Sequence, residues 1–291
     1  MRLGIIVTTI GRVAHLTELL SSVRDQLEMG DQVVISAQGD YSEVVRLASK
    51  WVALAGAIVV VKSSGGASQG RNDAVAALTH PVDYLLFPND SSRFPAGFLG
   101  RFRGLRSVSE AGAFTVVDEV GPKFVLPQRG AELTRENVWL VIEPGMFVRT
   151  SAFASVSGFN AGLGTGAHTP WQSGEGTDLL LRLMERSQHF RFDWLPDLQL
   201  FGISDSFGLS VHERRRKLRA YGRGYGYVIR LHGYPFERAI SILIGGATFG
   251  LRKGRPYRWA DGLSVFMGRL EGLLGVTLGK STTRSRSAVT R

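Results

Sequence analysis

The first half of the chain alternates short apolar runs with segments of helical periodicity, and this alternation is what most constrains the fold. Buried strands are predicted over 3–8, 32–37, 57–62 and 84–87, with helices over 15–27 and 42–54 and a third helix ending near Thr79. Strands that alternate with helices of this length predict an α/β fold with a mostly parallel mixed sheet and helices on both faces.

The second half is less regular. Strands are expected over 112–117 and 138–142, and the turn Glu143-Pro144-Gly145 precedes a further short strand. A glycine-rich loop over 158–166 comes before a helix that opens at Gly174-Glu175. No linker interrupts this part of the chain, so we expect a single domain over 1–206.

The composition limits the location and the chemistry of the protein. The chain has no cysteine, which excludes disulfides and thiolate metal sites. Its first residues hold only a short apolar run, which is typical of a first strand and too short for the core of a signal peptide. We therefore expect a cytoplasmic protein.

Basic residues are concentrated in the last 85 positions. From Phe207 onward there are 17 Lys and Arg against 4 Asp and Glu, a net charge of +13, whereas residues 1–206 sum to −3. An apolar run over 239–251 is too short for a transmembrane helix, which needs roughly 20 residues. We expect a basic amphipathic helical extension over 207–279 that binds an anionic membrane surface, and a disordered tail over 280–291. A pair of core helices with solvated basic faces is the alternative.

Polar residues follow each predicted strand of the first half at its carboxyl end, where open α/β sheets bind their ligands. They are Thr9, Gly11 and Arg12 after the first strand, Asp40 after the second, Arg71 and Asn72 in a loop over 65–72 after the third, and Asn89, Asp90 and Ser91 after the fourth. A carboxylate at such an edge can share a divalent cation with a phosphate, and a helix start favours an anion. Each motif alone is more typical of an ordinary turn, but together they suit a nucleotide diphosphate.

Two carboxylates, Glu175 and Asp178, lie three residues apart at the start of a predicted helix. Acidic residues in a first helical turn are favoured by the helix dipole, which is a sufficient structural reason for them. The functional interpretation is that one of them is a general base, with the glycine-rich loop closing over the substrate.

In their order, these motifs resemble family 2 glycosyltransferases of the GT-A fold. The resemblance rests on Ile5-Ile6-Val7-Thr8-Thr9-Ile10-Gly11-Arg12, Gly70-Arg71-Asn72, Phe87-Pro88-Asn89-Asp90-Ser91, Gly158-Phe159-Asn160 and Gly174-Glu175-Gly176-Thr177-Asp178-Leu179. It covers about residues 1–196. The following segment, with Tyr221-Gly222-Arg223-Gly224-Tyr225-Gly226, is similar to the membrane-associating tails of some bacterial members.

The resemblance implies a single Rossmann-like sheet, a UDP-, GDP- or dTDP-sugar donor, an Mg²⁺ or Mn²⁺ ion, and inversion at the anomeric carbon. It assigns donor binding to Thr9, Gly11, Arg12, Asp40, Arg71, Asn72, Asn89 and Asp90, the metal to Asp90 with Ser91 and His212, and the base to Glu175 or Asp178. Two departures from the family pattern stand out. Asn89 and Ser91 flank a single aspartate, and Gly176 takes the place of a second carboxylate, which makes Glu175 the first choice for the base. A lone histidine such as His212 is more often a surface residue.

We therefore expect an inverting glycosyltransferase, peripheral at the cytoplasmic face of the cell membrane, that acts on a lipid-linked or polysaccharide acceptor. A catalytically degenerate nucleotide-sugar-binding protein on the same scaffold is the main alternative. A nucleic-acid-binding protein is suggested only by the basic tail. That tail carries no recognisable nucleic-acid motif, so no nucleic-acid partner is expected.

Overall fold

The structure is a computed structural model that describes residues 1–51, 58–105, 109–203, 208–251 and 257–278. The chain divides into two compact units, Met1–Ser210 and Val211–Arg291, each of which is described by itself. The last residues of the second predicted helix, 52–54, and the predicted disordered tail over 280–291 lie outside the described residues.

The first unit is built on one sheet with the strand order β3-β2-β1-β4-β7-β5-β6, and β8 pairs with β5. The strands are β1 (Leu3–Thr9), β2 (Gln32–Ala37), β3 (Ile58–Lys62), β4 (Tyr84–Leu86), β5 (Ala111–Asp118), β6 (Gly121–Pro122), β7 (Met146–Arg149) and β8 (Phe192–Phe201). Strands β3, β2, β1 and β4 are parallel, β7 is antiparallel to both of its neighbours, and β8 is parallel to β5. The predicted α/β fold with an open, mostly parallel sheet is confirmed.

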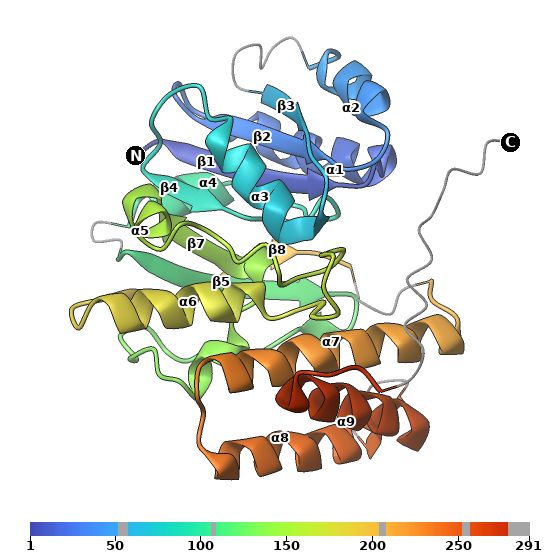
Figure 1. Ribbon diagram of the computed structural model, residues 1–291. Coiled ribbons are helices and arrows are strands. Elements are labelled where there is room, and N and C mark those ends of the chain that lie inside the picture. The colour runs from blue at the N-terminus through green and yellow to red at the C-terminus, as the bar shows by residue number, and fades with distance from the viewer. Residues whose placement is uncertain (52–57, 106–108, 204–207, 252–256, 279–291) are drawn as a thin grey trace, which may run out of the picture. The chain divides into compact units, whose positions relative to one another are not determined.

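Helices pack against the sheet because alternate strand residues point to opposite faces. On β1, Leu3, Ile5 and Val7 join a buried cluster with α1 (Val13–Arg24), α2 (Tyr41–Ala48) and α4 (Phe98–Arg103). Thr8 points to the opposite face, toward α3 (Gly66–Ala76). A Cβ on Gly70 of this helix would lie 2.9 Å from the methyl group of Thr8. Figure 1 shows α3 and α6 (Glu175–Arg186) on the side of the sheet that faces the viewer, with α5 (Thr150–Ser155) following β7.

The structure corrects several predictions about single elements. The expected strand over 138–142 is absent from this described stretch, which forms the 3-10 turns η2 (Asn137–Leu140) and η3 (Glu143–Gly145) instead. Strand β8 was not predicted, because Pro196 interrupts its pattern. The register between β5 and β8 shifts after Phe114, and the proline carbonyl accepts a hydrogen bond from Thr115 at 2.9 Å. A bulge thus accommodates the proline.

The second unit contains α7 (Val211–Leu231), α8 (Phe236–Ala247), η4 (Thr248–Leu251) and α9 (Trp259–Leu274). Helices α7 and α9 approach closely through glycines on both. A Cβ on Gly268 would lie 2.1 Å from the carbonyl oxygen of Arg219, and one on Gly226 would lie 2.2 Å from that of Arg269. The two backbones can therefore lie this close because glycines, which have no side chain, stand at these positions.

Part of the basic charge of this unit is used inside it. Glu271 of α9 is fully buried and accepts hydrogen bonds from Arg219 and Arg223 of α7, at 2.5 Å and 2.6 Å. Asp261, also fully buried, is paired in the same way with Arg214 and Arg215. These arginines neutralise buried carboxylates and are committed to them. The number of basic residues in the segment therefore exceeds the number available to bind an anionic partner.

The part of the chain that the structure describes contains no helix long and apolar enough to span a bilayer.

Candidate active site

Asp90 lies just beyond the carboxyl end of β4 and is held by Thr9, the last residue of the neighbouring strand β1, and by Arg12 beyond it. Thr9 donates its hydroxyl to Asp90 Oδ2 at 2.7 Å, and Arg12 Nε approaches the same oxygen at 3.1 Å. The other carboxylate oxygen accepts from a terminal nitrogen of Arg12. Because β1 and β4 are parallel neighbours, their polar ends meet at one edge of the sheet.

The turn that carries Arg12 depends on Gly11, which has a φ of +96°. The backbone N–H groups of Gly11 and Arg12 donate to Thr9 Oγ1 at 3.1 and 3.2 Å. A Cβ on Gly11 would lie 3.4 Å from the backbone nitrogen of Asp40, so Asp40 belongs to the same edge. Its carboxylate caps α2 by accepting from the N–H of Glu43 at 2.9 Å.

Arg12 and Asp90 differ in exposure, and this sets what an incoming ligand meets. Asp90 is 2% exposed, whereas 44% of the Arg12 side chain is exposed. A guanidinium that is partly free at a sheet edge offers N–H donors of the kind that bind phosphates. An anion at this edge therefore meets the cation first and the carboxylate behind it.

Asp90 and its two chain neighbours offer one carboxylate between them. Asn89 is exposed and Ser91 is buried, and their amide and hydroxyl oxygens add no charge. Among the described residues, no group of three or more His, Cys, Asp or Glu is placed to hold a metal. Mg²⁺ commonly takes one or two protein carboxylates and completes its shell with substrate phosphates and water. These residues fit an ion that arrives with a diphosphate, and they do not make a metal site by themselves.

His212, the third predicted metal ligand, belongs to α7 of the other unit. There the guanidinium of Arg216 lies 3.5 Å from its Nε2 atom. Its role as a ligand stays a prediction.

Arg71 and Asn72 project from the second turn of α3, and the structure corrects the expected loop over 65–72 to a helix that starts at Gly66. The Asn72 amide donates to the carbonyl of Phe159 at 2.8 Å and accepts from its N–H at 2.9 Å. Asn72 thus orders the glycine-rich loop. The buried Arg71 guanidinium lies over the Phe159 ring, 5.5 Å from its centroid, and Nη1 is 3.2 Å from Oε1 of Glu175.

The start of α3 was expected to bind an anion, but the glycine-rich loop covers it. The N–H of Ala67 donates to the carbonyl of Thr165 at 2.8 Å. A Cβ on Gly66 would lie 2.4 Å from the backbone nitrogen of Ala167, so the two backbones touch. This helix start is therefore occupied by protein.

Glu175 is the first residue of α6 and is 5% exposed. A Cβ on Gly164 would lie 2.9 Å from its carboxyl carbon and Oε1, so the glycine-rich loop lies directly on the carboxyl group. Burial, together with the negative charge of Glu143, raises the pKa of Glu175 to about 7, and Arg71 opposes this shift. A carboxyl group that titrates near neutrality is suited to accept a proton at physiological pH.

Asp178, the other predicted base, is 1% exposed and committed to Arg182. Its Oδ2 is 2.9 Å from both Nε and Nη2 of Arg182. Arg182 in turn donates to the carbonyls of Val156 and Gly158, at 2.5 and 2.8 Å. The Asp178–Arg182 pair therefore holds the start of the glycine-rich loop, and Glu175 is the better placed of the two for proton transfer.

Comparison with known proteins adds evidence on the fold. No protein-family model and no curated protein sequence matches the chain. The structure is similar to that of S. aureus TarS 1-349, with 16% identity and a TM-score of 0.56 over 94% of this chain and 72% of that one. TarS 1-349 in complex with UDP-GlcNAc matches with 15% identity and a TM-score of 0.54 (95% and 93% covered). The mannosyltransferase PcManGT from Pyrobaculum calidifontis, in complex with GDP-Man and Mn²⁺, matches with 14% identity and a TM-score of 0.59 (94% and 87% covered).

The chain has a GT-A-like fold. These structural neighbours are glycosyltransferases of that fold, and at such low identity the likeness concerns the fold alone. The strand ends that carry Thr9 and Asp90 belong to the GT-A-like sheet.

Glu143 is a residue of the GT-A-like unit that the sequence analysis did not identify. It lies in η3, directly before β7, and its Oε1 accepts a hydrogen bond from the N–H of Gly176 at 2.8 Å. A Cβ on Gly176 would lie 2.6 Å from that oxygen. A single glutamate before Pro-Gly is typical of a turn, so no signal in the sequence distinguished it.

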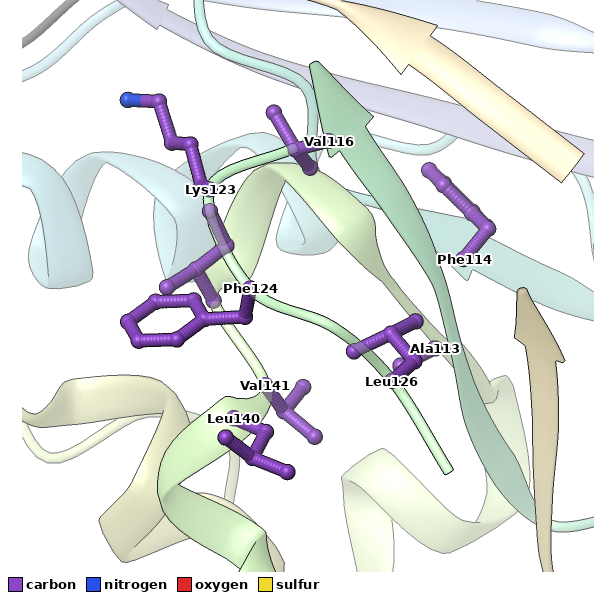
Figure 2. Close-up of a pocket in the computed structure, with 9 residues that line it drawn as sticks. Ala113, Phe114, Val116, Lys123, Phe124, Leu126, Leu140 and Val141 are labelled. Atoms are coloured by element: carbon purple, nitrogen blue, oxygen red, sulfur yellow. The ribbon is translucent and has the colours of Figure 1, made fainter. Parts of the chain in front are cut away.

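A small pocket lies beside β5 of the GT-A-like sheet, and Figure 2 shows the Lys123 side chain extending away from its apolar lining. The lining residues are Ala113, Phe114, Val116, Lys123, Phe124, Leu126, Leu140, Val141 and Ile142. Its free volume of about 10 Å³ is roughly that needed by one water molecule. It is too small for a nucleotide or a sugar.

Proposed function

We propose that the protein is an inverting glycosyltransferase that moves a sugar from a nucleotide-sugar donor to an acceptor hydroxyl. One observation carries the proposal. A GT-A-like sheet combines the Thr9–Arg12–Asp90 cluster at its strand ends with Glu175, a buried carboxyl group that titrates near neutrality. The neighbours TarS and PcManGT are in complex with UDP-GlcNAc and GDP-Man, which supports a donor of this class.

The donor is proposed to bind at the ends of β1, β2 and β4. The half-exposed guanidinium of Arg12 suits a diphosphate, while Thr9 and Gly11 fix the turn that presents it. The remaining predicted donor residues are Asp40 and Asn89, both exposed, and Arg71 and Asn72, which order the loop above the base.

An Mg²⁺ or Mn²⁺ ion is proposed to enter with the diphosphate, with Asp90 and Ser91 as its protein ligands. Asp90 is a buried carboxylate at the ends of β1 and β4, and PcManGT is in complex with Mn²⁺. When bound, the ion would act as a Lewis acid that offsets the charge on the leaving diphosphate.

Proton transfer is proposed to take place at the start of α6, with Glu175 ahead of Asp178. The acceptor oxygen would attack the anomeric carbon from the side opposite the diphosphate, and one such displacement inverts that carbon. Arg71 orients the Glu175 carboxyl group, and the loop at Gly164 shields it from water.

The protein is proposed to work at the cytoplasmic face of the cell membrane, on a lipid-linked or polysaccharide acceptor. Phe236, Ile240 and Ile244 follow one another at four-residue intervals on α8 and are 73%, 42% and 60% exposed. Trp259 and Leu263 of α9 are 74% and 50% exposed. Exposed apolar side chains in a unit of high positive charge suit an anionic leaflet.

Sedimentation with vesicles tests this location. The full chain is expected to bind phosphatidylcholine vesicles only when they contain phosphatidylglycerol. The triple change Phe236→Ser, Ile240→Ser and Ile244→Ser should abolish the binding, whereas Val120→Ser with Val125→Ser, two exposed residues of the first unit, should not. Unchanged binding by the triple variant would contradict the assignment of this face.

A catalytically degenerate nucleotide-sugar-binding protein on the same scaffold is the second candidate. It is favoured by the single carboxylate of Asp90, which Arg12 already neutralises. A thermal-shift panel with UDP, GDP and dTDP, each with Mn²⁺ and with EDTA, measures the binding that both candidates require. A shift that EDTA removes supports an ion bound with the diphosphate, and one that survives EDTA means that Arg12 suffices. No shift with any nucleotide would contradict both candidates.

A further inference from the structure

Glu175 is enclosed in a way that restricts its access to an acceptor. Its Oε1 is 3.2 Å from Arg71 Nη1, Gly164 lies against its carboxyl group, and only 5% of the residue is exposed. An acceptor hydroxyl could reach this carboxyl group only by displacing the arginine or the loop.

Glu143 brings a second carboxylate to the same helix start from a different element. It is partly exposed, and its Oε1 is 2.8 Å from the N–H of Gly176. Its other oxygen has no hydrogen-bond partner among the residues that the structure describes. The start of α6 favours a negative charge at this position.

Because Gly176 has no side chain, the Glu143 carboxylate can lie against the start of α6. A Cβ at position 176 would lie 3.1 Å from the carboxyl carbon of Glu143 and 2.6 Å from its Oε1, and the second distance is closer than such atoms approach. Any other residue would therefore push the Glu143 carboxylate away from the helix. The glycine and the glutamate form a matched pair, in which a side chain from η3 fills the space that position 176 leaves empty.

Resting on the glycosyltransferase function proposed above, we propose that Glu143 and Glu175 act as one proton-accepting pair and that Glu143 is the member that the acceptor hydroxyl meets. The acceptor O–H bond breaks and its proton passes to the Glu143 carboxylate. The electron pair of that oxygen forms the bond to the anomeric carbon. The bond from that carbon to the donor oxygen breaks, and its electrons leave with the diphosphate.

The charges around the pair favour this division of roles. Burial and the charge of Glu143 raise the pKa of Glu175 to about 7, so the two carboxyl groups titrate as a pair near neutral pH. Arg71 of α3 faces Glu175, and the N–H of Gly176 faces Glu143. Asp178, one turn along α6, is neutralised by Arg182. The partly exposed carboxylate of Glu143 is therefore the member of the pair that an acceptor hydroxyl can reach, and the buried Glu175 carboxyl group acts with it.

Two substitutions at different positions should remove the Glu143 carboxylate from the helix start. Glu143→Gln removes its charge, and Gly176→Ala displaces it. With UDP-GlcNAc or GDP-mannose as donor and water as acceptor, both should lower kcat by about 10²- to 10⁴-fold and leave KM for the donor unchanged. Glu143→Asp should restore part of the rate. Gly100→Ala is the matched control, because a Cβ there meets nothing within 4 Å. Full turnover by Glu143→Gln would overturn the proposal.

A titration without substrate separates this inference from the proposed function. Carbon-13 NMR of glutamate-labelled protein, with Glu175→Gln to assign the signal, follows the titration of Glu175. Glu143→Gln and Gly176→Ala should both move it to lower pH, because both remove the negative charge of Glu143 from the helix start. An unmoved titration would overturn the pairing whatever the turnover. If the unmodified chain consumes no donor but the titration moves as expected, the pairing stands and the glycosyltransferase function fails.

Discussion

The guanidinium of Arg12 contacts both carboxylate oxygens of Asp90 across the ends of two parallel strands, β1 and β4. Asp90 is buried while Arg12 reaches solvent, so the pair joins a fixed negative charge to an accessible positive one. This relationship links the stability of the sheet edge to its ability to bind an anion.

Arg12→Ala should destabilise the protein, because among the described residues it leaves the buried Asp90 carboxylate with Thr9 as its one remaining partner. We expect a loss of about 1–2 kcal/mol in the free energy of unfolding, limited by the exposure of Arg12. Adding Asp90→Asn should recover part of that loss, since no charge is then left unpaired. Urea unfolding of the two single variants and the double variant measures the coupling. Strictly additive effects would show that the pair contributes nothing.

The raised pKa of Glu175 predicts a pH dependence of stability. The unfolded carboxyl group loses its proton near pH 4.5, whereas the folded one keeps it until about pH 7. The folded state thus binds more protons across this window, and its stability falls as pH rises from 4.5 to 7, by at most roughly 1.4 kcal/mol per pH unit. When the urea midpoint is plotted against pH, the curves of the unmodified chain and of Glu175→Gln should differ in slope over this window only. Parallel curves would mean that Glu175 titrates normally.

Asp178→Asn should mainly lower the stability of the protein, whereas Glu175→Gln should mainly lower kcat. Loss of the buried Asp178 carboxylate leaves Arg182 unpaired and loosens the carbonyls of Val156 and Gly158, so stability should fall by about 1–3 kcal/mol. Asp178→Asn should lower kcat much less than Glu175→Gln does. Thermal melts and donor turnover of both variants provide the comparison. A variant of Asp178 that is stable but inactive would make Asp178 the base instead.

The close approach of α7 and α9 predicts that Gly268→Ala disrupts the second unit. The new Cβ would lie 2.1 Å from the carbonyl oxygen of Arg219, and overpacking of this kind costs about 1–3 kcal/mol. Gly245→Ala on α8 is the matched control, since its nearest neighbour at 3.3 Å is the flexible end of Arg269. Circular dichroism during thermal unfolding should show lower stability for the first variant alone. Equal stability of both would contradict the described packing.

The strand ends could be predicted from the sequence because apolar runs define parallel strands, and parallel strands bring their carboxyl ends together. That reasoning brought Thr9, Arg12 and Asp90 to one edge. It assigned Arg71 to a loop, because the stretch is rich in glycine and serine, whereas residues from Gly66 onward form α3.

Other features depend on contacts between distant segments, which no local pattern reveals. Glu143 becomes significant only because β7 brings η3 to the start of α6. Strand β8 needed a bulge opposite Phe114 to accommodate Pro196. The charge of the last 85 residues gave no sign that Arg219 and Arg223 neutralise the buried Glu271.

Release of nucleoside diphosphate from a panel of UDP-, GDP- and dTDP-sugars, in the presence of Mn²⁺, tests the central claim most directly. The account predicts release from at least one donor by the unmodified chain. Glu175→Gln should lower that release by about 10²-fold or more while still binding the nucleotide. Nucleotide binding without breakdown of any donor would contradict the claim and leave a binding protein on a GT-A-like scaffold.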